Sequence, residues 1–153
     1  MGTTPNLSLN KPVQGSTDWA DDVNANWDTI DSKLHAACIA FVIDGGGQAI
    51  TTGIKGDLEI PFACEIMGVT LGADQTGSIQ VDIWKDTYAN FPPTDADSIT
   101  ASAVPAISSS NKYQDSTLTG WTKSISAGDI LRFNVDSVST IQRCTVSLKV
   151  KRC

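Results

Sequence analysis

Few residues in this chain of 153 residues have the types and spacing that catalysis requires. A hydrolytic triad needs a histidine as general base, and the chain contains one, His35. This residue lies in the last turn of a predicted helix, where a cation ordinarily opposes the helix dipole. The acidic residues show no spacing that specifies a glycosidase pair. The sequence therefore predicts a protein that is not an enzyme, with a small esterase or glycosidase as the alternative class.

Metal and cofactor sites are not predicted either. The four cysteines include no C-x-x-C pair, so a zinc site is not expected. Asp95 and Asp97 form a lone D-x-D in a loop, for which solvated carboxylates are a simpler interpretation than a cation site. Cys38, Cys64 and Cys144 fall in predicted strands, where cysteine behaves as a small buried hydrophobic residue. The sequence does not decide whether Cys64 and Cys144 form a disulfide.

The charge of the chain excludes two classes of partner. The formal net charge is −6 and the basic residues are scattered, whereas nucleic-acid binding needs clustered Lys and Arg. An anionic membrane surface is disfavoured for the same reason. No window approaches the roughly 18 apolar residues of a membrane-spanning helix, and the N-terminus lacks the apolar region of a signal peptide. We therefore expect no nucleic acid, no membrane insertion and no secretion signal.

One helix is predicted, over residues 17–37. Ser16 and Thr17 are good N-cap residues, and acidic residues crowd the first turn, where the helix dipole favours them. The apolar positions recur at the four–three spacing of a coiled-coil seam. They are Val23, Trp27, Ile30 and Leu34, with Trp19 one turn upstream. We expect these residues to form an oligomerisation seam; two heptads are short for a coiled coil, so packing of the helix on its own β domain stays open.

The segment before the helix, residues 1–16, is predicted to be an extended arm. Pro5 and Pro12 oppose helix formation and favour extended backbone in the residues before them. Leu7 and Leu9 alternate with polar residues, a pattern that suits addition of a strand to another protein's sheet. Together with Pro12 and Val13 they are the candidate docking residues. A frayed terminus is the alternative interpretation.

Residues 38–153 are predicted to form a mainly β domain, an antiparallel β-sandwich or jelly roll of about eight short strands. The clearest strands are 77–84, with Ile79, Val81 and Ile83 on one face, and 130–136. A long segment, 86–111, interrupts the pattern and is expected to hold a short strand near 99–104. Loops of this length are usually functional or contact surfaces.

Four aromatic residues in or near this β domain are candidates for an exposed ligand surface. Aromatic rings at a surface can stack on sugar rings, so the ligand class would be a host glycan. Buried packing is the competing interpretation for the two tryptophans. The four residues are Trp84, Tyr88, Phe91 and Trp121.

The N-terminal third carries a family resemblance. The stretch NLSLNKPVQGSTDWADDVNANWDTIDSKL resembles the N-terminal segment of bacteriophage tail-fibre and virion-appendage proteins, which combine a Leu/Pro-containing arm, a Thr-Asp-Trp step and an Asn-Trp-Asp-x-Ile-Asp helix. The matching residues are Leu7, Leu9, Pro12, Thr17, Asp18, Trp19, Asn26, Trp27, Asp28, Ile30, Asp31 and Leu34. The segment from FVIDGGG onward is similar to a domain of phage-encoded virion proteins.

The resemblance implies a bacteriophage structural protein. Such a protein would be a homotrimer whose arm and helix dock on other virion proteins, of the capsid or of the tail. It would be made in the host bacterial cytoplasm and would end in the virion. We therefore expect a capsid-decorating or cement trimer, or a short tail fibre, without cofactor. The alternative is a tail-fibre tip that binds a host-surface glycan.

Overall fold

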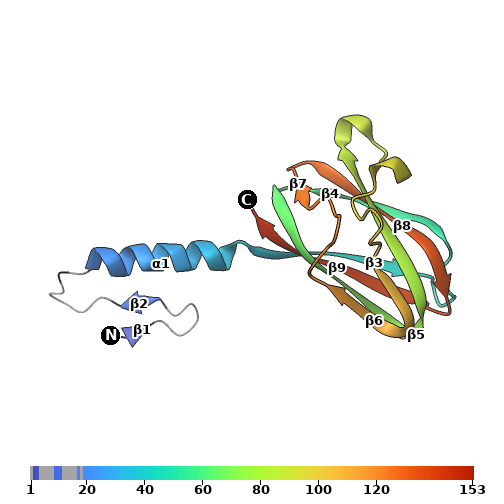
Figure 1. Cartoon of the computed structure of the whole chain (residues 1–153), viewed down its shortest axis with the longest axis horizontal. Coiled ribbons are helices and arrows are strands. Elements are labelled where there is room, and N and C mark those ends of the chain that lie inside the picture. The colour runs from blue at the N-terminus through green and yellow to red at the C-terminus, as the bar shows by residue number, and fades with distance from the viewer. Residues whose placement is uncertain (1, 4–8, 12–16, 18) are drawn as a thin grey trace. The chain divides into compact units, whose positions relative to one another are not determined.

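The computed structural model describes residues 2–3, 9–11, 17 and 19–153, with the side chains of residues 2–3, 10–11 and 31–34 outside the described part. The chain divides into two compact units, Met1–Ala37 and Cys38–Cys153, which we describe one at a time. Figure 1 shows the helix and two short strands of the first unit and the curled sheet of the second.

The first unit contains one helix and a short strand pair. Helix α1 spans Trp19–Leu34, with Asp21 and Asp22 in its first turn, where acids are favoured. It is shorter than the predicted 17–37, because the backbone of the strand that follows is already extended at Ala36. In the arm, β1 (Gly2–Thr3) pairs antiparallel with β2 (Asn10–Lys11), and β2 lies against α1.

Most of the predicted docking residues of the arm fall outside the described residues. Leu7, Pro12 and Val13 belong to this group. Leu9 is described and is partly buried. Their proposed role in docking therefore stays a prediction.

The second unit is an antiparallel β structure, as predicted. Within the described residues it has seven strands, in the order β3-β9-β5-β8-β4, while β6 and β7 also pair with β5. Their bounds are β3 Ala36–Asp44, β4 Gly53–Ile60, β5 Cys64–Thr87, β6 Ala106–Asp115, β7 Ser124–Ile125, β8 Asp129–Ser139 and β9 Arg143–Arg152. The number is below the predicted eight because the predicted strand 77–84 is not separate but is part of the longer strand β5, which begins at Cys64.

Strand β5 runs through both halves of the sheet. Its first part, Cys64 to Ala73, pairs with β9, and its second part, Ser78 to Thr87, pairs with β8. Between the two parts the register with β6 shifts around Gly77. A Cβ atom on Gly77 would lie 2.5 Å from the carbonyl oxygen of Ser139, so a residue without a side chain is needed where the β8–β9 turn approaches.

The core lies inside the curl of the sheet. The predicted alternation is confirmed where it was clearest, because Ile79, Val81 and Ile83 of β5 are buried, and so are Leu131, Phe133 and Val135 of β8. The buried residues include Ile79, Val81, Ile83, Leu131, Phe133, Val135, Val146, Leu148 and Val150. Phe41 of β3 stacks on Phe133 of β8, with ring centroids 4.2 Å apart. Since β3 pairs with β9 at the other end of the sheet, this contact requires the two ends of the sheet to face each other.

The strand register corrects one prediction about the cysteines and decides a question that the sequence left open. Cys38 is exposed rather than buried, because β3 turns Ile39 and Ile43 inward and its even-numbered residues outward. Cys64 lies opposite Arg152, whereas Cys144 lies opposite Ala73. These positions are nine residues apart along β5, roughly 30 Å for an extended strand. A Cys64–Cys144 disulfide is therefore impossible, and all four cysteines are free thiols.

The thiols should differ sharply in reactivity. Burial, and to a smaller extent the carboxylate of Asp74, raises the pKa of Cys144 to about 11, so its thiol stays protonated and inert near neutral pH. In a dithionitrobenzoate titration of the native protein at pH 8, Cys153 should react rapidly and Cys144 only after denaturation in guanidinium. Accordingly, Cys153→Ser should remove a native equivalent, and Cys144→Ala should not. A loss of native reactivity in the Cys144→Ala variant would contradict this placement.

Candidate functional site

The most elaborate surface feature of the β unit is the segment between β5 and β6, residues 88–105, which we call the β5–β6 loop. It forms the yellow-green projection at the top of the β unit in Figure 1. It contains two short 3-10 turns, η1 (Tyr88–Asn90) and η2 (Asp95–Asp97). The short strand predicted near 99–104 is wrong: the Ala103 N–H donates to the Thr100 carbonyl in a turn, and Ala101 has a φ of 50°.

A buried carboxylate fastens this loop to the sheet. Asp82 of β5 is 5% exposed. It accepts hydrogen bonds from the Ile83 N–H and the Trp84 indole, both at 2.7 Å. From the loop, the hydroxyls of Ser98 and Thr100 donate to it at 2.8 and 2.5 Å. Because a carboxylate has about four lone-pair sites, these donors use its capacity and explain why it can be buried.

The structure divides the four predicted surface aromatics into two pairs. Trp84 and Trp121 are each 8% exposed, and the indole of Trp121 donates to the Ala103 carbonyl at 3.0 Å. Their prediction as exposed ligand contacts is wrong, and the competing interpretation, buried packing, is confirmed. The indole N–H of Trp84 donates to Asp82 of β5, and that of Trp121 donates to a carbonyl of the β5–β6 loop. Tyr88 and Phe91, by contrast, are 78% and 49% exposed.

Arg132 contacts one of the two exposed aromatic residues, Phe91. The guanidinium of Arg132 lies 5.4 Å from the ring centroid of Phe91 and donates to the Pro93 carbonyl at 3.1 Å. It also donates twice to the Asp57 carboxylate, at 2.7 and 2.9 Å, and this partner raises the pKa of Arg132. The fork geometry thus holds a loop carbonyl, an aromatic ring and a strand of the sheet together.

Several carboxylates lie in or near the β5–β6 loop. The N–H and hydroxyl of Thr94 donate to Asp97 and lower the pKa of its carboxyl, so it is ionised at neutral pH. The pKa of Asp136 is raised, first by burial and further by the charges of Asp82 and Asp95. The raised value indicates that these carboxylates are close enough to repel one another.

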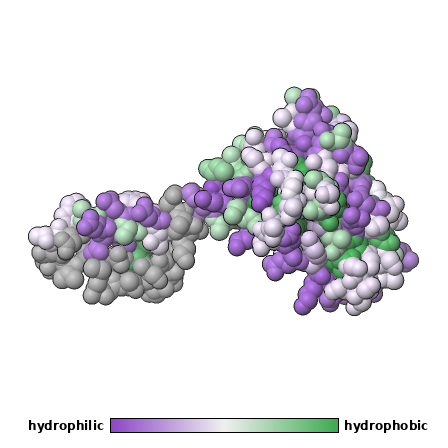
Figure 2. All heavy atoms as spheres, in the orientation of Figure 1, coloured by the Kyte–Doolittle hydropathy of each residue, from purple (hydrophilic) through white to green (hydrophobic). Residues whose placement is uncertain are grey.

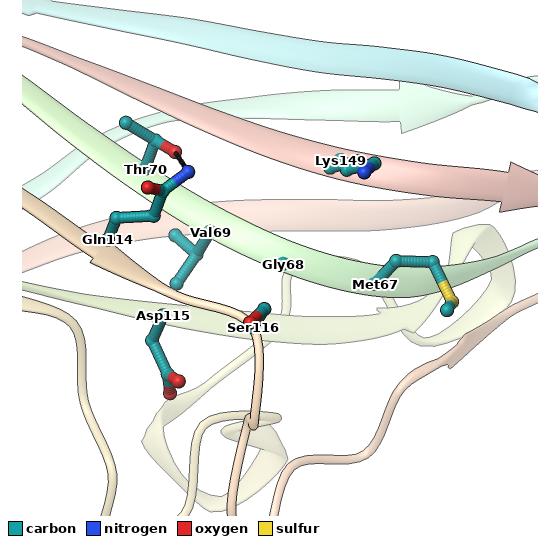
Figure 3. Close-up of a pocket in the computed structure, with 8 residues that line it drawn as sticks. All are labelled: Met67, Gly68, Val69, Thr70, Gln114, Asp115, Ser116 and Lys149. Atoms are coloured by element: carbon teal, nitrogen blue, oxygen red, sulfur yellow. Dashed lines mark hydrogen bonds between the residues drawn. The ribbon is translucent and has the colours of Figure 1, made fainter.

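A separate groove of about 460 Å³ lies on the outer face of the sheet near β5, where the register with β9 shifts between Ile66 and Gly68. Figure 3 shows the residues around it, with Gln114 of β6 donating to the hydroxyl of Thr70 at 3.4 Å. The lining residues are Met67, Gly68, Val69, Thr70, Gln114, Asp115, Ser116 and Lys149. The Asp115 carboxylate already accepts from the backbone N–H groups of Thr117 and Leu118. The lining of the groove includes no histidine and no cysteine.

The predicted seam residues of α1 have unequal exposure within their unit. Trp19 and Trp27 are 59% and 64% exposed, while Val23 and Ile30 are partly buried. The side chain of Leu34 is outside the described part. The most covered residue is Asp22, at 7%, and its Oδ2 atom has no donor among the described residues.

Neither a cluster of metal-ligating side chains nor a membrane-spanning helix occurs among the described residues. Among them, no group of three or more His, Cys, Asp or Glu side chains is placed to hold a metal ion. Asp97 serves instead in the capping box of η2, with Thr94. No helix in the described ranges is both long enough and apolar enough to cross a membrane.

Comparison with known proteins gives no assignment, since no protein-family model and no curated protein matches the chain. The candidate surfaces therefore rest on their own geometry: the exposed tryptophans of α1 and the exposed aromatics of the β5–β6 loop.

Sequence reasoning missed the residues that build the loop. Alternation along β5 indicated that Asp82 and Trp84 point away from the core, but not that a loop would cover them. The Asp57–Arg132 pair depends on the register between β4 and β8, which joins residues far apart in the chain. One signal in the sequence was available. Asp82 lies between two apolar residues of a predicted strand, and a long segment rich in Ser and Thr follows, which could supply donors to its carboxylate.

Removing the Asp82 carboxylate should loosen the β5–β6 loop. In Asp82→Ala, the buried donors of Trp84 and Thr100 lose their acceptor, and we expect the free energy of unfolding to fall by about 3 kcal/mol. Urea denaturation followed by tryptophan fluorescence measures this change. The matched control is Asp95→Ala, an exposed carboxylate of the same loop, which should change stability by less than about 0.5 kcal/mol. Equal losses in the two variants would contradict the role assigned to Asp82.

Proposed function

We propose that this chain is a non-enzymatic structural protein of a bacteriophage virion, a homotrimer held together by α1 and anchored through its N-terminal arm. The observation that carries the proposal is the pair of tryptophans, Trp19 and Trp27, which remain largely exposed on the heptad stripe of an otherwise polar helix. The capsid-decorating or cement role, or that of a short fibre, follows from the resemblance of residues 6–34 to virion-appendage proteins.

The arrangement of covered and exposed residues on α1 supports a partner helix. At about 100° per residue, Trp19, Val23, Trp27 and Ile30 form one stripe. Next to this stripe lies a row of polar residues, Asp22, Asn26 and Thr29, whose side chains are buried or partly buried within the unit. The stripe itself is therefore left open on one side, as expected if copies of the same helix complete it.

The energy available from this stripe is substantial. An aromatic side chain of this size carries about 150–250 Å² of surface, and each of these rings leaves more than half in water. Burying that remainder is worth on the order of 2–4 kcal/mol per ring at 25 cal/mol per Å². A trimer would bury both rings of three chains and would also present three arms to one particle, so that weak docking contacts add by avidity.

The glycan-binding alternative is weaker than the trimer proposal. It relied on four aromatic side chains, and two of them, Trp84 and Trp121, are buried with their indole N–H groups satisfied. An esterase or glycosidase is weaker still, because the aromatic loop and the outer groove lack a histidine and lack a specified carboxylate pair.

A charge placed in the stripe should dissociate the trimer. We expect Trp27→Asp combined with Ile30→Asp to convert the assembly into monomers in sedimentation velocity, since a carboxylate in an apolar seam costs several kcal/mol. The matched control is Ala25→Asp, which adds the same group to an exposed position of the same helix and should leave the trimer intact.

Disulfide cross-linking can test whether the helices of the trimer are parallel. In parallel helices the copies of Cys38, which is exposed just after α1, would lie near one another. Oxidation in a Cys153→Ser background should then give a covalent dimer on a non-reducing gel. A wild-type chain that sediments as a monomer, with no Cys38 cross-link, would refute the assembly.

The proposal that the protein is a virion component can be tested on purified phage particles. We expect an antibody against residues 38–153 to label the outer surface of purified particles of the phage that carries this sequence, visible as immunogold in electron microscopy. Deletion of residues 1–16 should abolish the label while leaving the trimer. Particles without label, despite abundant protein in the lysate, would rule out a virion component.

A further inference from the structure

We propose that Tyr88 and Phe91, which we call the aromatic tip, form a contact site for a basic segment of a partner protein, with an arginine or lysine side chain seated on the Tyr88 ring. This surface lies in the β unit, apart from the α1 stripe. It therefore adds a second interface to the proposed function without depending on it.

The two rings of the aromatic tip lie on the same side of a 3-10 turn. Tyr88 opens the 3-10 turn η1, and the N–H of Phe91 donates to the Tyr88 carbonyl at 3.3 Å. Side chains three residues apart in such a turn lie on the same side. Tyr88 and Phe91, 78% and 49% exposed, thus present their rings as neighbours at the end of the loop.

The tip is also held in place before any partner arrives. Asp86 accepts from the Thr87 N–H at 2.7 Å and from the Asn90 amide at 3.1 Å, across the base of η1. Arg132 fixes the other side through the Phe91 ring and the Pro93 carbonyl. Since the backbone of the tip is already ordered, binding here costs less conformational entropy than binding to a mobile loop.

The charge of the surroundings selects the partner. From residue 86 to residue 111 the chain contains no Lys or Arg, while Asp86, Asp95 and Asp97 lie in the tip and the adjoining turn. The nearest cations are engaged, Lys85 with Asp129 at 2.9 Å and Arg132 with Asp57 at 2.7 Å. Figure 2 shows hydrophilic side chains gathered around this projection. A cationic partner is attracted by this field, and an anionic one is repelled.

The protein already contains the contact that we propose for the partner. The guanidinium of Arg132 lies over the Phe91 ring while Asp57 neutralises it, so a cation, a ring and a carboxylate form one unit. Tyr88 offers a more exposed ring, two residues along the chain from Asp86, and no described cation lies over it. A partner arginine would complete the same arrangement there.

The test uses the full-length protein and a hexa-arginine peptide as probe. In ¹⁵N-labelled protein at low salt, the peptide should shift the amide signals of residues 86–91 most strongly, and the shifts should shrink in 200 mM salt, about the concentration at which the Debye length falls below 8 Å. Tyr88→Ala should weaken the fitted affinity by about two- to five-fold, the range expected for an exposed cation–π contact. Tyr88→Phe, which keeps the ring, should retain the affinity of the wild type.

Controls distinguish binding of the peptide at the aromatic tip from non-specific attraction of a cationic peptide to an acidic protein. Ile54→Ala removes another exposed apolar side chain and should not change the affinity. Shifts spread evenly over acidic residues elsewhere, or an unchanged affinity in Tyr88→Ala, would overturn the proposal. So would tip shifts caused by neutral maltohexaose and absent with hexa-arginine, which would assign the tip to a glycan. None of these outcomes touches the α1 assembly, because the signals of residues 86–91 report on the β unit alone.

Discussion

The β unit depends on one continuous strand, β5, which must pair along its whole length while crossing from one half of the sheet to the other. Each half would leave an apolar face in water if it were flat. By bending near Gly77, β5 lets the β3–β9 end fold over the β8–β4 end, and Phe41 then meets Phe133 in the middle. The same strand carries Asp82 on its outer face, so the core and the surface loop are tied to one element.

This dependence explains why the β5–β6 loop can be both long and ordered. A loop of this length ordinarily loses too much entropy to be fixed without compensation. Here, Asp82 gathers donors from both the strand and the loop, and Arg132 closes the far side against Asp57. The order at the base leaves Tyr88 and Phe91 exposed at the end, where their rings are free to contact another molecule.

Much of the fold could be predicted from local pattern. Alternation identified Ile79, Val81 and Ile83 as inward residues, and the change from helical to alternating spacing placed the start of the β domain near Cys38. Exposure of Cys38 and the Asp57–Arg132 pair could not be predicted, because they depend on which strands become neighbours. Burial of Trp84 was one of the two interpretations that the sequence left open, and the structure decides for it. Periodicity specifies which residues share a face, whereas register and loop cover decide whether that face meets water.

The helix raises the reverse question, because its heptad pattern was clear and the partner that we propose for it is another copy of the chain. Its stripe of Trp19, Val23, Trp27 and Ile30 is what a short coiled-coil seam requires, and both tryptophans remain exposed within the unit. The most direct test is the mass of the native assembly. Native mass spectrometry of the full-length protein should give three times the chain mass of 16.2 kDa. A single peak at the mass of one chain, unchanged as the concentration rises, would contradict the account.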